Sequence, residues 1–454
     1  MINALRIQNF KSLKDTGILR ISPLTFFVGP NSSGKSSIIK AIVATHQTAL
    51  TDDPEVPLQT EGKVLNLGSF QDFVYNHDER KKVQFDFEYD IKGSIRWSLK
   101  NRPGNLVRVD SNVLFSSKFV KGPQTKIVAQ ETTYLLNNFK NLQLTVSKNK
   151  LYGAGGYIGS ARLGNEAVRY TPEKLTRFWN VEFATGRDKY TNISRSTEFE
   201  YNLTYILSAL TMHFERLITN IFYIGPIRKE PLLIYSGRSE QPREVGALGE
   251  DALQALWVGR YNKKQRQIKN KVDYWMKEFG IAKTTKLRKY SSSLFQYYLT
   301  DLHTGIKSRL LDVGFGASQL LPLIVQGYLA PADSHILAEQ PEIHLHPKAQ
   351  GTLADMMIDI VSSKDKKIIA ETHSGYLLMR LLTRIAQGEI TNKDLSIYYF
   401  NPTESGTEVI PIDIDEKGRI NSSTLPDGFF EEGFAESLEF SKALAESING
   451  SQNK

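Results

Sequence analysis

The chain has 454 residues, which exceeds one ordinary domain and predicts one large lobe with one or two smaller ones. Its 40% hydrophobic and 23% charged residues are typical of a globular protein, and no apolar run is long enough for a membrane-spanning helix. There is no cysteine, which excludes disulfides, C-x-x-C zinc sites and thiol catalysis, and the net charge of +8 is mildly basic. The amino-terminal residues alternate like a strand and lack the apolar core of a signal peptide, so we expect a cytoplasmic protein without a membrane partner.

The first elements surround a glycine-containing loop. Two short strands are predicted at Leu5–Phe10 and Ile18–Ile21, and a third, apolar strand ends at Val28. Residues 29–36 then read G-P-N-S-S-G-K-S, a complete G-x-x-x-x-G-K-[ST] pattern, and a helical pattern starts near Ser36. Backbone N–H groups and the positive end of a helix surround a phosphate in such a loop. We expect the chain to bind a nucleoside triphosphate; a plain glycine- and serine-rich turn is the alternative.

The residue types in this loop predict individual roles. Lys35 is expected to reach the β- and γ-phosphates, and the Ser36 hydroxyl to bind Mg²⁺. ATP with Mg²⁺ is the predicted cofactor, although no base-reading motif separates ATP from GTP. The predicted nucleotide-binding residues are Gly29, Asn31, Ser32, Ser33, Gly34, Lys35, Ser36 and Ser37.

A long middle segment predicts mostly strands and then helices. Alternating apolar and polar residues, broken by glycine, asparagine and proline, predict β-structure across 82–180. Apolar residues at helical spacing predict a helix over 199–221, and a further helix is expected near 250–259. A basic helix is predicted over roughly 260–278.

Positive charge is concentrated at the end of this segment. Between Arg260 and Lys289 there are eleven lysine or arginine residues against two acids, Asp273 and Glu278. Such a run is typical of a surface that contacts a DNA backbone. It is equally typical of a solvated helix face or of a surface that meets an acidic partner.

From about residue 290 strands and helices alternate, which predicts a parallel sheet with right-handed crossovers. The predicted elements are strands 294–299 and 306–310, the segment G-F-G-A-S-Q, helix 318–329, strand 335–339, helix 347–361, strand 367–371, helix 374–387 and closing strands in 395–420.

Polar side chains follow two of these strands. Glu339 ends the first strand, where an acid of the Walker B type would hold Mg²⁺. His373 follows the second strand, and the carboxyl ends of neighbouring parallel strands share the crevice where such sheets bind ligands. We predict that His373 contacts the γ-phosphate; a lone histidine in a turn or cap is the alternative.

The ordered motifs resemble the ABC-type ATPases of the RecF/SMC and OLD-like group. They are N-F-K-S-L, G-P-N-S-S-G-K-S-S, G-F-G-A-S-Q, E-Q-P-E-I-H-L-H-P and E-T-H-S, with weaker likeness at Gly225–Pro231 and Gly246–Ala252. More narrowly, the chain is similar to stand-alone ATPases of the AAA15/AAA21 and DUF3696 type that end in P-x-G-F-F, here Pro426–Phe430. The resemblance implies an α/β fold with a mixed, largely parallel sheet and flanking helices. It implies head halves at 1–74 and 305–454 and an inserted β-rich and helical lobe at 75–304.

The resemblance also implies a homodimer or higher homo-oligomer, in which two heads enclose ATP between them. Gly316, Ser318 and Gln319 would then approach the γ-phosphate bound by the partner copy. Glu342, His344 and His346 would form a loop that crosses the dimer interface; a metal site at the H-x-H pair is the alternative. Gln71 is the candidate for a glutamine loop that senses Mg²⁺.

Gln340 departs from the pattern of these relatives, which place a second acid after the Walker B acid. A glutamine orients water through its amide but does not accept a proton. We therefore expect Glu339, Gln340 and His373 to form the catalytic set, with slow hydrolysis or with assistance from Glu342 or His373. An engineered substitution that traps ATP is the alternative.

The function implied by the resemblance is an ATP-driven switch that controls a separate effector. The segment after His373 is too short for a Toprim nuclease domain, and the middle segment is too short for the coiled coils of SMC proteins. The chain looks like the ATPase subunit of an antiphage system such as Septu, which pairs with an HNH nuclease. A RecF-like DNA-repair ATPase and a nucleotide-loaded scaffold with negligible turnover are the alternatives.

Overall fold

The computed structural model of the chain describes residues 1–96, 106–137, 142–148, 157–163, 166–170, 174–182, 197–259 and 263–421. Its internal contacts divide the chain into two units. Unit 1 comprises residues 1–21, 36–221 and 402–408, and unit 2 comprises residues 22–35, 222–401 and 409–454. The domain division at residues 74 and 304 stays a prediction, and the P-x-G-F-F segment lies outside the described residues.

Unit 1 is built on a nine-stranded sheet with the order β10-β9-β8-β7-β6-β5-β1-β2, in which β3 also pairs with β1. The predicted β-structure in the middle segment is confirmed, and β5 continues the sheet from the amino-terminal strand β1 through an antiparallel pairing. The strands are β1 (Ile2–Phe10), β2 (Leu13–Asp15), β3 (Leu19–Arg20), β5 (Val83–Arg96), β6 (Leu106–Lys121), β7 (Ile127–Leu136), β8 (Leu142–Lys148), β9 (Tyr157–Leu163) and β10 (Glu166–Tyr170).

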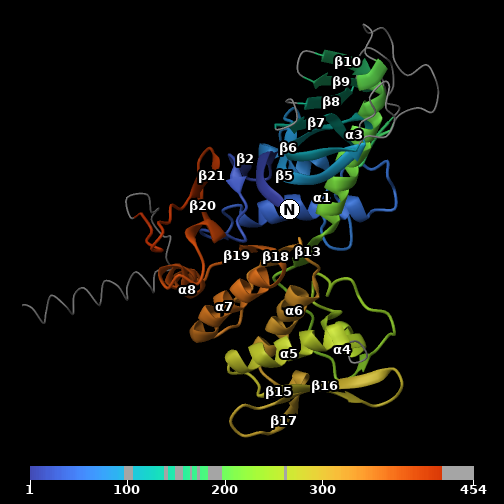
Figure 1. Cartoon of the computed structure of the whole chain (residues 1–454). Helices are drawn as coiled ribbons and strands as arrows, with labels where there is room; N and C mark the ends of the chain where they lie inside the picture. The colour runs from blue at the N-terminus through green and yellow to red at the C-terminus, as the bar shows by residue number, and fades with distance from the viewer. Residues whose placement is uncertain are drawn as a thin grey trace, which may run out of the picture. The chain divides into compact units, whose positions relative to one another are not determined.

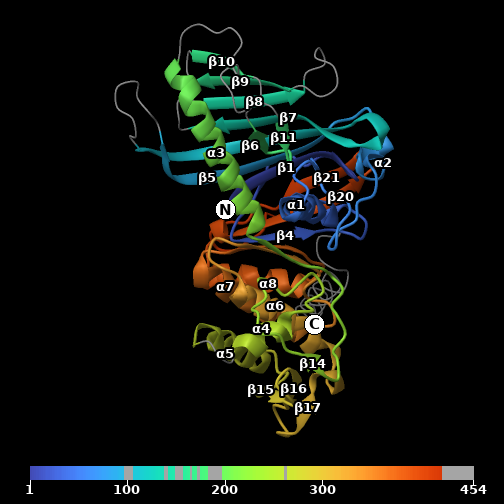
Figure 2. The same cartoon turned by 90° about the vertical axis from the view of Figure 1, so that its right-hand side faces the viewer.

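One long helix, α3 (Thr197–Thr219), crosses a face of this sheet (Figure 2). Phe214 of α3 is fully buried among aromatic rings, with ring centroids 4.2 Å from Phe115 on β6 and 5.7 Å from Phe87 on β5. Trp179 closes the cluster at 5.6 Å from Phe214. Offset aromatic pairs of this kind add to the free energy gained by burying apolar area. The smaller elements of this part are α1 (Lys35–Leu50), α2 (Phe70–Phe73), the two-stranded β11 (Lys174–Thr176) with β12 (Asn180–Glu182), and short turns.

Unit 2 contains a six-stranded sheet with the order β13-β18-β19-β4-β20-β21. The pairs β18–β19, β19–β4 and β4–β20 are parallel, as predicted. These strands are almost fully buried and rich in isoleucine, leucine and phenylalanine, which is typical of parallel sheets covered by helices. The strands are β4 (Leu24–Val28), β13 (Ile221–Ile224), β18 (His335–Glu339), β19 (Lys367–Glu371), β20 (Leu395–Thr403) and β21 (Gly406–Pro411).

Helices α6 (Phe315–Leu329), α7 (Pro347–Lys364) and α8 (Gly375–Ala386) pack on this sheet, and α4 (Ala252–Gly259) and α5 (Lys263–Glu278) form the next layer (Figure 1). The prediction that the helix starts at residue 318 is wrong, because α6 already begins at Phe315 with Gly314 as its N-cap. The first turn of a helix has N–H groups without intrahelical partners, so a glycine there costs little.

A small antiparallel sheet completes unit 2 beyond α4 and α5. It consists of β14 (Tyr235–Ser236), β15 (Thr284–Lys289), β16 (Leu294–Thr300) and β17 (Lys307–Arg309), in the order β14-β16-β15 with β17 also paired to β16. The Phe295 ring of β16 stacks on Trp257 of α4 with centroids 4.5 Å apart. The basic run of the sequence is therefore shared between the helix α5 and the strand β15. Among the described residues, every helix is too short or too polar to span a bilayer.

We expect Phe214→Ala to lower the free energy of unfolding of unit 1 by about 3–5 kcal/mol, because it opens a cavity among four aromatic neighbours. Urea unfolding followed by circular dichroism measures this loss. Met212→Ala is the matched control on the same helix: Met212 is 64% exposed, so its truncation should change stability by no more than about 0.5 kcal/mol. Equal effects of the two substitutions would contradict this packing.

Candidate nucleotide-binding site

The glycine-containing loop follows β4, which lies between β19 and β20 in the sheet of unit 2. Gly29 has a φ of 137°, and a Cβ at this position would lie 2.5 Å from the Phe400 carbonyl oxygen. Ser32 and Gly34 also have positive φ angles, 61° and 99°. The loop therefore requires glycine at position 29 for both backbone geometry and space. Its curled backbone, followed directly by helix α1, has the form that surrounds a phosphate.

Lys35 lies deep in this loop, with 2% of its surface exposed. Its Nζ donates to the carbonyl oxygens of Gly29 at 3.0 Å and Pro30 at 2.7 Å, and it lies 3.8 Å from a carboxylate oxygen of Glu371. Burial lowers the pKa of Lys35, and Glu371 opposes that effect. The loop thus holds a buried cation at the carboxyl end of the sheet.

Two glutamates end adjacent strands beside this lysine. Glu339 of β18 and Glu371 of β19 are directly paired in the parallel register. The Tyr223 hydroxyl, on the neighbouring strand β13, donates to Oε1 of Glu339 at 2.8 Å. Oxygen donors of this kind suit Mg²⁺, so the residues present fit the predicted cation. Tyr223 and Glu371 are site residues that the sequence reasoning did not assign.

A hydrogen bond connects His373, which follows β19, to Glu342, which follows β18. The backbone N–H of His373 donates to Oε1 of Glu342 at 2.7 Å, while Oε2 of Glu342 and Nε2 of His373 are buried and have no hydrogen-bond partner within the described structure. Burial raises the pKa of Glu342. Burial, together with the charge of Lys35, lowers the pKa of His373 and so favours its neutral form. A carboxylate with a raised pKa is a better proton acceptor at neutral pH.

Arg228 is another buried cation of unit 2. It lies in the loop after β13, is 6% exposed, and its Nε and Nη1 atoms have no hydrogen-bond partner among the described residues. Burial lowers the pKa of Arg228 to about 10, against the opposing effects of Tyr223, Glu339 and Glu342. The guanidinium therefore stays charged at neutral pH beside the acid cluster. Sequence reasoning missed Arg228, although the glycine and proline of the G-P-I-R segment after a strand gave a weak signal.

Gln340 occupies a strained backbone position. Its φ is 45°, which is unusual for a residue with a side chain, and its N–H donates to the Glu371 carbonyl oxygen at 2.9 Å. Glutamine at this position places an amide, not a carboxylate, next to Glu339. The buried carboxylate in this turn belongs to Glu342.

The first turn of α6 lies beside the loop after β18. The Phe315 ring, 62% exposed, lies 5.9 Å from the His344 ring, and a Cβ on Gly316 would be 3.7 Å from the His344 carbonyl oxygen. The Ser318 hydroxyl donates back to the Phe315 carbonyl oxygen at 2.8 Å, and Ser318 is 7% exposed. Gly316 and Gln319 are half-buried. The predicted contact of these residues with a partner copy stays a prediction.

The remaining predicted residues are placed as follows. Asn31 and Ser32 are exposed on the loop, Ser33 and Ser37 are buried, and Ser36 lies half-buried in the first turn of α1. Gln71 is exposed in α2 of unit 1, and its role toward Mg²⁺ stays a prediction. His346 caps α7 through its side chain, which accepts from the Lys348 N–H at 3.3 Å. Among the described residues no group of three or more His, Asp or Glu side chains could hold a metal ion. The H-x-H metal alternative stays a prediction.

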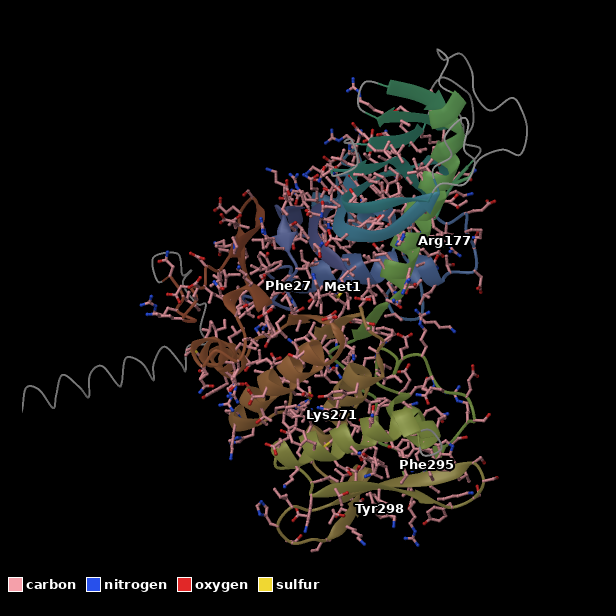
Figure 3. All side chains as sticks on the ribbon, in the orientation of Figure 1. Met1, Phe27, Arg177, Lys271, Phe295 and Tyr298 are labelled. Atoms are coloured by element: carbon pink, nitrogen blue, oxygen red, sulfur yellow. The ribbon has the colours of Figure 1, made fainter. Side chains whose placement is uncertain are left out.

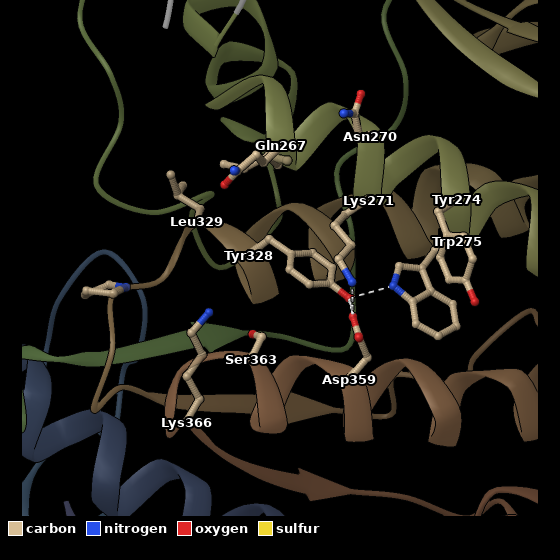
Figure 4. Close-up of a pocket in the computed structure, with 12 residues that line it drawn as sticks. Gln267, Asn270, Lys271, Tyr274, Trp275, Tyr328, Leu329, Asp359, Ser363 and Lys366 are labelled. Carbon is tan, nitrogen blue, oxygen red and sulfur yellow. Dashed lines mark hydrogen bonds and ion pairs between the residues drawn. The ribbon is translucent and has the colours of Figure 1, made fainter. Parts of the chain in front are cut away.

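A cavity of about 910 Å³ lies elsewhere in unit 2, lined by residues of α5, α6 and α7 (Figure 4). Its polar groups bind one another: Lys271 pairs with Asp359 at 2.7 Å, and the Trp275 indole N–H donates to the Tyr328 hydroxyl at 2.6 Å. It contains no glycine-rich loop and none of the residues that surround Lys35. The candidate phosphate-binding loop lies instead at the end of β4, next to β19.

One known family model matches most of the chain. The model of the AAA ATPase domain (AAA_15) matches residues 1–230 and 258–378, which is well over half of the chain. The chain belongs to the AAA_15 ATPase family. The predicted P-loop ATPase head fold is thereby confirmed. A second model, Protein of unknown function (DUF3696), matches residues 390–439. No curated protein matches the chain.

Solved structures of SMC heads align with most of this AAA_15 protein at low sequence identity and low TM-score. One is the SMC head bound to the C-terminal winged-helix domain of ScpA, at 15% identity, covering 91% of this chain and 98% of that one, with a TM-score of 0.43. Another is the SMC head domain from Thermotoga maritima, at 11% identity, 91% and 99% coverage and a TM-score of 0.36. A third is the SMC head with an extended coiled coil bound to the C-terminal domain of ScpA from Pyrococcus furiosus, at 11% identity, 99% coverage of both chains and a TM-score of 0.39.

We expect Arg228→Ala to reduce steady-state ATP turnover by about 10²-fold, the usual effect of removing one preorganised donor from a charged site. Arg228→Lys should restore part of the rate, since it keeps the charge but loses the planar fork. Phosphate release measures turnover, and thermal melting shows that each variant is folded. Exposed Lys229→Ala is the control with the same charge change; an equal loss in it would refute a specific role for Arg228.

Gln340→Glu tests whether position 340 limits hydrolysis. A carboxylate there adds a proton acceptor next to Glu339, so we expect faster turnover under saturating ATP and Mg²⁺. Glu342→Gln should slow turnover in both the parent and the Gln340→Glu background if Glu342 assists the reaction. A Gln340→Glu variant no faster than the parent would show that residue 340 does not limit the rate.

Proposed function

We propose that this ATPase is a nucleotide-driven switch that assembles head to head around ATP and controls a separate effector protein. The observation that carries the proposal is the group of buried ionic side chains at one end of the parallel sheet of unit 2. Lys35 lies 3.8 Å from Glu371, which is paired in register with Glu339. Two buried cations, Lys35 and Arg228, accompany these acids. Together these groups form a site suited to a polyanion that binds with a divalent cation.

In this proposal Lys35 releases its carbonyl contacts and binds the β- and γ-phosphates. The Ser36 hydroxyl and Glu339 would hold Mg²⁺, which would supply positive charge against the phosphates. Tyr223 orients the Glu339 carboxylate through its 2.8 Å hydrogen bond. Arg228, whose Nε and Nη1 have no hydrogen-bond partner among the described residues, stabilises negative charge that develops on the terminal phosphate.

Water activation is assigned to Glu342, with Gln340 orienting the water through its amide. Glu342 has a raised pKa and a buried Oε2 without a hydrogen-bond partner in the described part of the chain, which are the properties of a proton acceptor. His373, held by Glu342 through its backbone N–H, directs toward the terminal phosphate in this proposal its Nε2, which also has no partner among the described residues. Because the reaction then depends on an acid two positions beyond Gln340, we expect slow turnover.

Head-to-head assembly is supported by the surface at the first turn of α6. An exposed phenylalanine, Phe315, lies against His344 next to two glycines, and exposed aromatic side chains of this kind mark protein interfaces. In the assembled state Gly316, Ser318 and Gln319 approach the ATP of the partner copy. ATP would favour the closed assembly only by binding it more tightly than the open one.

The proposed effector is a separate nuclease, in an antiphage system of the Septu kind. Within the described residues no group of three or more His, Asp or Glu side chains is placed to hold metal ions, as a two-metal nuclease centre would need. A RecF-like role on DNA is the second candidate, favoured by the basic residues of α5 and β15. A scaffold that binds ATP without turnover is the third, favoured by Gln340.

The test is the assembly state of the full chain by size-exclusion chromatography with light scattering, with and without ATP and Mg²⁺. We expect ATP to shift the parent to a larger species, and Lys35→Ala to abolish that shift because the phosphates lose their main cation. Lys40→Ala, on the same helix, is the control with the same charge change.

The biological part is tested by phage challenge of cells that carry the gene with its genomic neighbours. Protection that disappears with Lys35→Ala and persists with Lys40→Ala supports defence. If neither nucleotide nor Lys35→Ala changes the assembly state, the switch proposal is wrong. If assembly depends on nucleotide but the cells are not protected, the switch proposal stands and the defence proposal is wrong.

A further inference from the structure

The small sheet β15–β16–β17 has two faces of opposite character. The face toward α4 and α5 is apolar: Phe295, Tyr297 and Leu299 are each no more than 2% exposed. Figure 3 shows Phe295 on the helical side of the sheet and Tyr298 on the opposite side. We call that opposite side the outer face. Antiparallel pairing places on it Lys286 and Arg288 of β15, Gln296, Tyr298 and Thr300 of β16, and Lys307 and Arg309 of β17. Gln296 is buried there, with 5% of its surface exposed.

The outer face carries four cations. Lys286, Tyr298 and Arg309 are directly opposite one another across the three strands, with Arg288 and Lys307 in the neighbouring rows. Arg309 pairs with Asp312 at 2.6 Å. Within the part of the chain that the structure describes, Lys286, Arg288 and Lys307 have no ion-pair partner. Three cations without ion-pair partners among the described residues share this sheet face, two on β15 and one across β16 on β17, and together they attract a polyanion.

Aromatic rings lie between these charges. The Tyr298 hydroxyl donates to Oε1 of Gln296 on the same strand at 2.9 Å, so the ring leans along the strand. Tyr290, at the end of β15, is 58% exposed, and the Arg288 guanidinium lies 5.9 Å from its ring centroid. Flat aromatic and guanidinium surfaces among cations are the groups on which unpaired bases stack.

The helix α5 offers less free charge than its sequence suggests. Lys269 pairs with Asp273 in the next turn, and Lys271 pairs with Asp359 of α7 at 2.7 Å. Asp273 also accepts from the Thr285 N–H at 2.8 Å, which ties α5 to the inner side of β15. Of the two elements that share the basic run, the sheet is the better surface for a polyanion.

We propose that the outer face of β15–β16–β17 binds a single-stranded nucleic acid, with Lys286, Arg288 and Lys307 on phosphates and the Tyr298 and Tyr290 rings against bases. A duplex hides the faces of its bases in the stack, so it would leave both tyrosines unused. An acidic protein would meet the cations but gain nothing specific from the rings. The surface lies wholly within unit 2, and the inference does not depend on the proposed ATP switch.

The test is fluorescence anisotropy of the full chain with a labelled oligothymidylate of about 16 nucleotides, titrated at several salt concentrations. Replacing Lys286 and Arg288 together by glutamine should flatten the slope of log affinity against log salt by about 1.4, roughly 0.7 for each lost phosphate contact. Tyr298→Leu should weaken binding about tenfold without changing the slope, and Tyr298→Phe, which keeps the ring, should bind like the parent.

The matched control replaces the exposed Arg266 and Lys277 of α5 by glutamine, which removes the same charge from the neighbouring helix. It should leave binding unchanged. Three results would each overturn the proposal. They are an equal loss of affinity in this control, equal affinity for a duplex of the same length, and displacement by polyglutamate as readily as by unlabelled oligonucleotide. Melting temperature and ATP-dependent assembly, measured on every variant, separate this outcome from misfolding and from failure of the switch.

Discussion

The structure of the site depends on one buried charge, the ammonium of Lys35 at the carboxyl end of β4. A cation with 2% exposure is tolerated only when carbonyl oxygens and an acid compensate it, and the loop provides two carbonyls and Glu371. The pairing of β19 with β4 brings Glu371 within reach of the lysine. The pairing of β18 with β19 then places Glu339 next to Glu371. The compensation of this one charge therefore depends on the order of three strands.

Several buried polar atoms near Lys35 have no hydrogen-bond partner among the described residues. Arg228 keeps two nitrogen atoms without partners, and Glu342 and His373 each keep one buried atom without a partner, within the described residues. Unsatisfied buried polar atoms cost free energy, and they are typical of sites that complete their bonding with a ligand. A triphosphate with its cation would supply acceptors to the arginine and histidine. The stability of this region should therefore rise when nucleotide binds.

Unit 2 combines this site with a second surface of different chemistry. The small sheet is anchored by Phe295 and Trp257 on its inner face, so its outer face is free to present charge. A strand serves both faces at once, because successive residues point to opposite sides: one set packs on the helices and the other set faces outward. Lys286 and Tyr298 can vary on the outer side without disturbing the packing that supports Leu299.

The sequence by itself determined the local chemistry: the glycines of the loop, Lys35, and the strands that end at Glu339 and Glu371 all follow from motif and hydrophobic pattern. It also predicted the parallel sheet, because β18, α7, β19 and α8 alternate in the chain. It did not identify Arg228 or Tyr223, which act on Glu339 from more than a hundred residues away in sequence, nor which lysines of the basic run are neutralised. Such pairings depend on strand order and on which faces are buried, and only the tertiary structure decides these.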